Sequence, residues 1–326
     1  MNKPSVLTAA LLLAGLSTTP LFATAASSTT ISGAIEIEAG FSEDYNGVSG
    51  SDIATATVEL GIDSTVNDKV STHILLLHED GDTIAVDEAS LSINMGEGLS
   101  LTAGQVFLPF GSHESNMISD SLTLGLAEAQ ETVVQFDYQS GAINSSFYLF
   151  NGDVVETGAE ESIDGMGFNI AYATDDLTFG VSYINNIADS DSITAVVTPS
   201  VVSYVAGMSV YANASFGNTS IIFEHTAALD AFDVAEVALA GTTPTATNLE
   251  VGFAMDNAVF AIAAQSSSEA LGLGLPETRV LVSYTRELIK DTSLAFEYSS
   301  DEDYSLADGG TGNTASATTV KLAVGF

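Results

Sequence analysis

The sequence predicts an all-β protein, a closed antiparallel transmembrane barrel of about sixteen strands. Three observations predict this fold. Segments of about ten residues alternate apolar and polar side chains along most of the chain. The connections between these segments are short and long in turn. The last segment, 317–326, alternates in the same way and stops on Phe326, where the end of a soluble domain would ordinarily fray.

Alternation and turn residues together predict sixteen strands. An even number suits closure of a single-chain antiparallel barrel. Closure matters because lipid cannot satisfy the hydrogen bonds of an open sheet edge. The expected strands are 31–41, 52–63, 68–79, 84–94, 99–107, 130–139, 142–151, 164–174, 176–185, 203–216, 218–229, 246–256, 258–267, 277–286, 291–300 and 317–326.

The connections give an independent indication of the same fold. Those after even-numbered strands are tight, as at Ser140-Gly141, whereas those after odd-numbered strands are mostly long, as at 108–129. The short connection 80–83 is the exception. Short periplasmic turns and long outer loops are typical of outer-membrane barrels, so both termini are expected in the periplasm. A soluble β-solenoid or sandwich would not predict this alternation.

The first 25 residues have the pattern of a secretory signal peptide. Lys3 is followed by the apolar stretch Val6 to Leu16 and by the small-residue motif Ala23-Thr24-Ala25. The apolar stretch is too short for a membrane helix. We therefore expect residues 26–326 to form the barrel domain. Ending on a strand with a terminal aromatic resembles bacterial outer-membrane proteins, which contact lipid and lipopolysaccharide.

Composition excludes several functional classes. The chain has no cysteine, so disulfides and thiolate metal sites are excluded. It has 6 Lys and Arg against 43 Asp and Glu, a surface that repels nucleic acid. It is also 46% hydrophobic, which suits a barrel with an apolar wall and a wet lumen. We expect no cofactor and no metal site.

Strand alternation assigns side chains to the two faces of the barrel wall. In 31–41 the odd-numbered residues face lipid, and in 52–63 Ala54, Ala56 and Val58 are expected outside with Thr55 inside. A sixteen-stranded barrel is wide enough for an aqueous channel. The expected inward carboxylates greatly outnumber inward basic residues and favour cations; they are Glu36, Glu38, Glu59, Asp137, Glu224, Glu250 and Glu297.

An acidic stretch, 75–89, lies around the one short outer turn. Carboxylates crowded at a channel mouth attract cations and repel anions. Two other interpretations stay open: a solvated hairpin tip without a ligand, or a Ca²⁺ site between lipopolysaccharide molecules. The carboxylates of this stretch are Glu79, Asp80, Asp82, Asp87 and Glu88.

The longest loop, 108–129, is unusually apolar for an exposed segment. Each of its large apolar side chains would gain roughly 1.5–3 kcal/mol by leaving water. Folding into the lumen would bury them and narrow the pore; packing on a neighbouring subunit is the alternative. The side chains concerned are Phe110, Met117, Ile118, Leu122, Leu124 and Leu126.

Catalysis has little support in the sequence, and we expect no enzyme. The segment 112–115, Ser-His-Glu-Ser, has residue types found in hydrolases, but adjacency along the chain does not give the geometry of a catalytic triad.

Part of the chain resembles a known family. The segments LLLHEDGDTIAVDEASLSI (75–93) and AGQVFLPFGSHESNMISDSLTL (103–124), with Glu131-Thr132, are similar to the LbtU family of siderophore porins. The resemblance covers roughly residues 31–153. It implies a porin-like barrel in the outer membrane that imports ferric siderophore.

The sequence therefore predicts an outer-membrane channel for small solutes, with ferric siderophore import implied by the resemblance. A non-specific cation-preferring porin and a structural or adhesive barrel remain as alternatives, and a homo-oligomer stays open. Closure should bring Lys321 near Glu36, with paired residue numbers summing to about 357. The candidate ligand-binding or pore-lining residues are Glu79, Asp80, Asp82, Asp87, Glu88, His113, Glu114, Asp120, Glu36, Glu59, Arg279 and Lys321.

Overall fold

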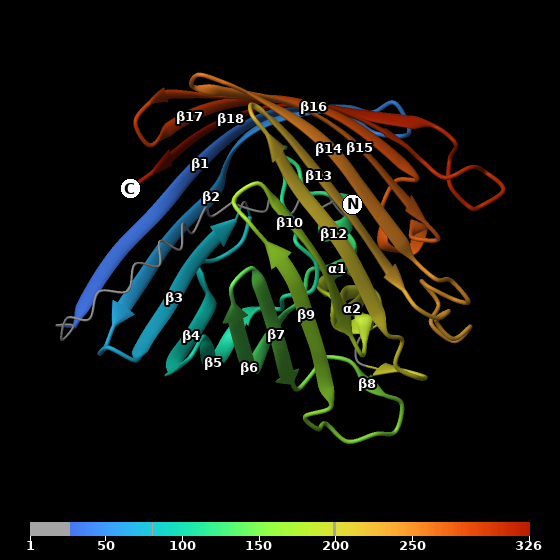
Figure 1. Ribbon diagram of the computed structural model, residues 1–326. Helices are drawn as coiled ribbons and strands as arrows, with labels where there is room; N and C mark the ends of the chain where they lie inside the picture. Colours follow the sequence, from blue (N-terminus) through green and yellow to red (C-terminus); the bar gives the residue numbers. More distant parts are fainter. Residues whose placement is uncertain (1–26, 80, 198–199) are drawn as a thin grey trace.

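A computed structural model describes residues 27–79, 81–197 and 200–326. The expected signal peptide and Asp80 lie outside the described residues. Sixteen of the described strands form one closed antiparallel barrel, in agreement with the sequence prediction (Figure 1). The barrel strands are β1 (Ser28–Glu43), β2 (Ser49–Thr65), β3 (Val70–Glu79), β4 (Ala85–Gly96), β5 (Leu99–Phe107), β6 (Gln130–Ser140), β7 (Ile143–Phe150), β9 (Gly165–Ala173), β10 (Leu177–Ile184), β12 (Gly207–Phe216), β13 (Thr219–Ala228), β14 (Thr245–Met255), β15 (Ala258–Ser268), β16 (Thr278–Ile289), β17 (Thr292–Glu302) and β18 (Thr314–Gly325).

Each barrel strand pairs with its sequence neighbour, and β1 pairs with β18 to close the wall. Strand pairs are joined alternately by tight turns, such as 141–142, and by longer connections at the other end of the barrel, such as 108–129 and 185–206. This asymmetry agrees with the pattern expected from the sequence.

The long connections contain structure that the alternation pattern did not predict. They hold the short helices α1 (Leu122–Ala127) and α2 (Asp191–Val197) and the 3₁₀ turns η1 (Ile187–Asp189) and η2 (Leu271–Leu273). They also hold β8 (Val155–Glu156) and β11 (Ser200–Val201), which form a small parallel sheet of their own. Helices of six and seven residues are too short for a periodic apolar pattern to reveal.

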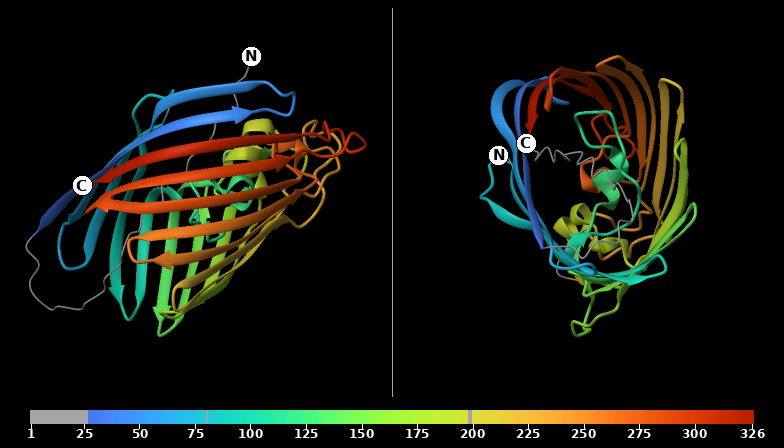
Figure 2. Two further views of the ribbon diagram at one scale, coloured as in Figure 1. Left: turned by 90° about the horizontal axis from the view of Figure 1, so that it is seen from above. Right: turned by 60° about the vertical axis from the view of Figure 1, so that its left-hand side comes forward.

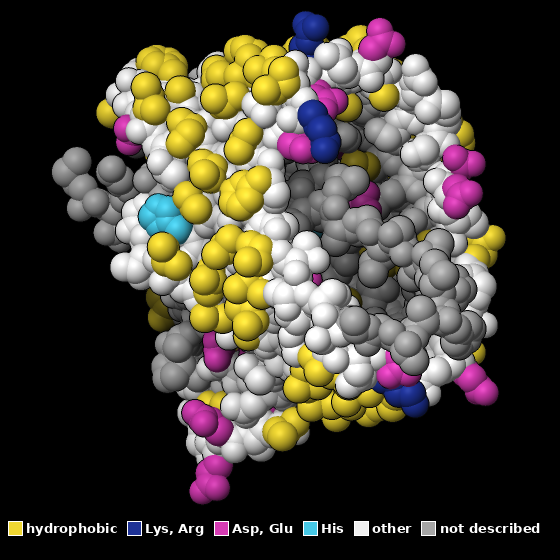
Figure 3. All heavy atoms as spheres, turned by 90° about the vertical axis from the view of Figure 1, so that its left-hand side faces the viewer, with side chains coloured by type: hydrophobic (Ala, Val, Ile, Leu, Met, Phe, Trp, Pro, Cys, Tyr) yellow, Lys and Arg dark blue, Asp and Glu magenta, His cyan; other side chains and the backbone are white. Residues whose placement is uncertain are grey.

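Hydrophobic side chains cover much of the outer wall seen in Figure 3. Ile31, Ile35 and Phe41 of β1 are exposed, as alternation predicted. The face assignment was wrong in the first part of β2, because Ala56 is an extra residue in a β-bulge. The bulge places Thr55 opposite the outward-facing Ile37.

The barrel seam carries the predicted ion pair. Lys321 Nζ lies 3.1 Å from Glu36 Oε2, and both side chains are largely buried. The register differs from the expected one by two residues, because Phe326 exchanges backbone hydrogen bonds with Gly33. Lys321 is therefore directly opposite Glu38 rather than Glu36. The ammonium reaches diagonally to Glu36 and lies between two carboxylates.

We expect Lys321→Glu to impair folding more than Lys321→Ala. The alanine variant loses a cross-strand pair worth roughly 0.2–1 kcal/mol, whereas the glutamate variant also places a third carboxylate beside Glu36 and Glu38. Urea titration of the purified barrel, followed by circular dichroism, measures both effects. Equal midpoints for the two variants would contradict a charge-specific role at the seam.

Candidate functional site, the constricted lumen

The loop 108–129 folds into the barrel, as its apolar composition predicted. Helix α1, which belongs to this loop, contacts β13, β14 and β15. In the second view of Figure 2 the loop and its helix lie inside the ring of strands. Phe110, Leu122 and Leu126 are at most 1% exposed, so the interior supplies the burial that these side chains require.

Other long connections complete an apolar core around this loop. Ile187 and Ile193 come from the connection 185–206, and Phe232 and Leu239 come from 229–244; all four belong to one buried cluster with Phe110. The cluster also takes in Tyr148 of β7 and Ala246 of β14. A packed core thus fills the lumen on the side of these strands.

The inner wall holds the loop through a carboxylate on β13. Glu224 accepts hydrogen bonds from the backbone N–H groups of Ser112, at 2.8 Å, and His113, at 3.0 Å. Consecutive backbone N–H groups form a concavity suited to an anion. His113 adopts a positive φ of 54° to present its N–H, and Gly111, with φ 102°, leaves no room for a side chain beside the Glu224 carboxylate.

Two more glutamates repeat this arrangement along the loop. Glu250 of β14 accepts from the backbone N–H of Asn116, at 2.8 Å, and from the Ser115 hydroxyl, at 2.8 Å. Glu297 of β17 accepts from the backbone N–H groups of Ile118, at 2.5 Å, and Ser119, at 3.1 Å. We call Glu224, Glu250 and Glu297 the loop clamps. Each is at most 3% exposed, so the clamps face inward as predicted but are covered by the loop.

The strands between the clamps add further contacts. Gln265 of β15 accepts from the Leu122 N–H, and Ser283 of β16 donates to the Asn116 carbonyl. Arg279 of β16 donates to the Asp120 carbonyl at 3.2 Å while forming a bidentate pair with Asp301. Arg279 therefore fixes the loop to the wall.

The neighbouring part of the wall, β1 to β4 with β18, carries carboxylates that the loop does not clamp. Register places Glu59 of β2 on the inward face, and Glu79 of β3 is directly opposite the inward-facing Thr57. Glu88 of β4 is paired with the inward-facing Leu75. Lys321 is the one Lys or Arg of the described residues that forms an ion pair with this wall. We call the set Glu36, Glu38, Glu59, Glu79 and Glu88 the carboxylate wall.

The structure separates the remaining candidate residues. Asp82 lies in the turn between β3 and β4, and its backbone N–H bonds the Glu79 carbonyl. Asp87 is the extra residue of a second bulge and accepts a hydrogen bond from the Gln130 side chain at 3.1 Å.

Glu114 and Asp120 lie in the clamped loop. Burial raises the pKa of Glu114. The His113 imidazole contacts the clamp Glu224. Burial lowers the pKa of His113, but the Glu224 carboxylate raises it by more than burial lowers it, so the net shift of the pKa is upward.

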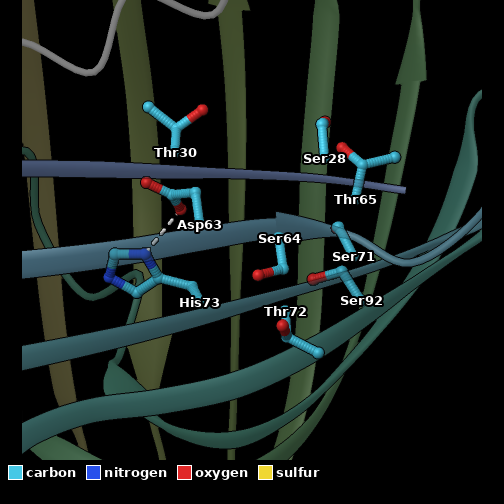
Figure 4. A pocket seen from close by; sticks show the side chains of 9 residues that line it. All are labelled: Ser28, Thr30, Asp63, Ser64, Thr65, Ser71, Thr72, His73 and Ser92. Atoms are coloured by element: carbon cyan, nitrogen blue, oxygen red, sulfur yellow. Dashed lines mark hydrogen bonds and ion pairs between the residues drawn. The ribbon is translucent and has the colours of Figure 1, made fainter. Parts of the chain in front are cut away.

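A polar hollow near the other end of the carboxylate wall was not predicted (Figure 4). It has a volume of about 150 Å³ and is lined almost entirely by hydroxyl side chains of β1 to β4. His73 Nδ1 lies 2.8 Å from Asp63 Oδ1 within it. Serine and threonine alternating with apolar residues are ordinary in a barrel strand, so no residue pattern pointed specifically to this hollow.

A buried acidic group where the other long connections meet the loop was also missed. The Asp191 N–H bonds the Glu128 carbonyl, and Asp189 accepts from the Val154 N–H at 3.0 Å. Burial, followed by the nearby carboxylates Asp120 and Asp191, raises the pKa of Glu128 to about 7. Burial also raises the pKa of Asp189 to about 7, against its own hydrogen bonds.

The described residues contain no group of three or more His, Asp or Glu side chains arranged to hold a metal ion. Within the same residues, no helix is long and apolar enough to cross a membrane.

Comparison with known proteins gives distant relatives. No known family profile matches the chain. A UPF0422 protein of Coxiella burnetii is 27% identical over 297 residues, covering 84% of this chain and 64% of that protein. A UPF0422 protein of Legionella pneumophila strain Paris is 26% identical over 317 residues, covering 85% of this chain and 59% of the relative. The chain thus spans about six-tenths of the length of these relatives.

Solved structures define the fold class. The anion-selective porin of Comamonas acidovorans matches with a TM-score of 0.69 at 14% identity, covering 92% of this chain and all of that one. The outer membrane channel DcaP of Acinetobacter baumannii matches with a TM-score of 0.67 at 14% identity, covering 92% and 97%. A trimer form of Vibrio cholerae OmpT gives 0.59 at 13% identity, covering 93% and 100%. The chain has the fold of the porins.

Releasing the clamps should widen the pore. In Glu250→Ala with Glu297→Ala the loop loses charged hydrogen bonds worth roughly 1.5–3 kcal/mol each, so single-channel conductance and current noise should both rise. Deleting 117–126 should raise conductance further. Glu302→Ala, at the exposed end of β17, is the control. Unchanged conductance in a correctly assembled double variant would show that the loop does not narrow the path.

The long connections that pack around Glu128 and Asp189 should loosen as pH rises. The carboxyls of Glu128 and Asp189 have raised pKa values in the folded barrel, against about 4 in an unfolded chain. Their contribution to stability is fully present below about pH 4 and is lost as pH rises through about 7. Hydrogen exchange of 122–129 and 186–197, corrected for its intrinsic pH dependence, should be faster at pH 8 than at pH 5. Asp189→Asn should flatten this difference and the exposed Glu160→Gln should not; an identical profile in both variants would contradict the assignment.

Proposed function

We propose that this chain is an outer-membrane diffusion channel that prefers cations. The observation that carries the proposal is the division of the inward carboxylates into two sets. The loop clamps are bound by backbone N–H groups, whereas the carboxylate wall is not bound by the loop and has Lys321 as its ion-paired cation. Carboxylates in a narrow lumen concentrate cations and repel anions. The fold alone does not determine whether a channel prefers cations or anions, because a porin of the same fold is described as anion-selective.

Orientation and assembly belong to the same proposal. The connections on one side of the barrel are tight turns and those on the other side are long, which supports short turns and both termini in the periplasm. The hydrophobic outer wall supports contact with outer-membrane lipid and lipopolysaccharide. One fold neighbour is described in a trimer form, and a homo-oligomer is proposed here by analogy.

The narrower proposal is that ferric siderophore is among the imported solutes. It rests on the resemblance of residues 31–153 to siderophore porins. The carboxylate wall favours a neutral or cationic complex over an anionic one. Single-channel current with and without a ferric siderophore, and growth of a deletion strain on single iron sources, test it. Normal growth of that strain on every iron source would reject siderophore import and leave the channel proposal standing.

Reversal potentials across a salt gradient test the cation preference. In Glu38→Gln, Glu59→Gln, Glu88→Gln the cation-to-anion permeability ratio should fall by roughly threefold or more, because the local field that concentrates cations weakens. The matched control neutralises three turn carboxylates outside the lumen: Asp68→Asn, Asp175→Asn and Asp256→Asn. Anion preference in the natural protein would overturn the proposal.

A further inference from the structure

Two β-bulges flank one region of the carboxylate wall. Ala56 is the extra residue between β1 and β2, and Asp87 is the extra residue between β3 and β4. Bulges locally re-aim side chains and are common beside functional sites. The strand between them, β3, ends at Glu79. The two irregularities thus enclose a short piece of inner wall centred on Thr57 of β2.

Thr57 is a buried hydroxyl without a partner. It is 0% exposed, and its Oγ1 has no hydrogen-bond partner among the described residues. It is directly opposite Glu36 on one side and Glu79 on the other, and Glu59 is the next inward residue on its own strand. Buried polar groups are ordinarily hydrogen-bonded, and the exceptions call for an explanation.

The same wall already accepts one alkylammonium. The Lys321 ammonium lies 3.1 Å from Glu36 Oε2 and is directly opposite Glu38. One oxygen of Glu38 is also buried without a hydrogen-bond partner. No Lys or Arg of the described residues forms an ion pair with Glu59 or Glu79. The wall therefore holds more carboxylate than its own cation neutralises.

The spacing favours an organic cation over a bare metal ion. A metal ion needs several donor atoms within about 2.0–2.6 Å, and the described residues contain no such group. An ammonium group has three N–H donors that reach acceptors at about 2.7–2.9 Å. Glu79 is paired with Thr57 and Glu59 with Leu77, so the two carboxylates are diagonal neighbours on adjacent strands. Diagonal side chains start about 7–8 Å apart and are within reach of one another when they are long, which suits the longer reach of an ammonium group.

We propose that Thr57, Glu59 and Glu79 form a binding site for the primary ammonium group of a small organic cation. The ammonium donates to both carboxylates and to the Thr57 hydroxyl oxygen, which has no hydrogen-bond partner of its own in the described part of the chain. The site lies beside the Lys321–Glu36 pair and, like that pair, binds an ammonium group through carboxylate oxygens. This inference rests on the proposed cation-preferring channel and names the class of solute that binds transiently in its lumen.

Single-channel recording on the full barrel tests the site with 1,4-diaminobutane as the probe and 1,4-butanediol as its neutral analogue. The diamine should reduce the current at concentrations where the diol does not. Glu59→Gln with Glu79→Gln should raise the half-blocking concentration about tenfold, and Thr57→Val about threefold, as expected for lost charge-assisted and neutral hydrogen bonds. Asp175→Asn with Asp256→Asn, in turns outside the lumen, should leave the block unchanged.

Reversal potentials recorded on the same channels separate the two proposals. Cation preference without a diamine block, or a block that the double variant leaves unchanged, overturns the site alone. Anion preference overturns the channel proposal as well. Thr57→Val removes a hydroxyl that has no partner, so its unfolding midpoint should match that of the natural barrel. A large loss of stability in this variant would assign Thr57 a structural role and reject the site.

Discussion

The architecture of the lumen depends on one interaction, the binding of carboxylates on the wall by backbone N–H groups of the inward loop. Glu224, Glu250 and Glu297 are almost fully buried, yet no Lys or Arg of the described residues forms an ion pair with them. A buried carboxylate without partners would cost several kcal/mol. Here the loop supplies those partners from its own peptide groups. The same bonds satisfy N–H groups that the loop would otherwise bury unpaired.

This interaction explains how a chain with 43 acidic and 6 basic residues folds a loop into its own lumen. Apolar side chains on one face of the loop join the core formed by the other long connections, and N–H groups on the other face bind the clamps. The consequence is electrostatic asymmetry. The loop side of the lumen has its charge compensated locally, and the side formed by β1 to β4 does not. The proposed cation preference is therefore attributed to the carboxylate wall.

The sequence predicted the barrel well because strand periodicity and turn chemistry are local properties. The strand number, the inward fold of 108–129 and the pair between Lys321 and Glu36 all follow from parity, hydrophobicity and closure. Alternation failed where a bulge adds one residue: Ala56 breaks the parity of β2, so Thr55 faces outward. Nothing in local composition marks that position. The clamps were placed on the correct face, but their partners are backbone groups at least 100 residues away, which residue types alone do not reveal.

The division of the inward carboxylates into clamps and wall is tested by comparing the solvent accessibility of the two sets. The chain has no cysteine, so single-cysteine variants report on one position each. Glu79→Cys, in the carboxylate wall, and Glu250→Cys, under the loop, are treated with a charged methanethiosulfonate reagent while single-channel current is recorded. We expect Glu79→Cys to be modified roughly tenfold faster or more than Glu250→Cys, because thiol reactivity follows access. Equal rates at the two positions would contradict the claim that the loop covers the clamps.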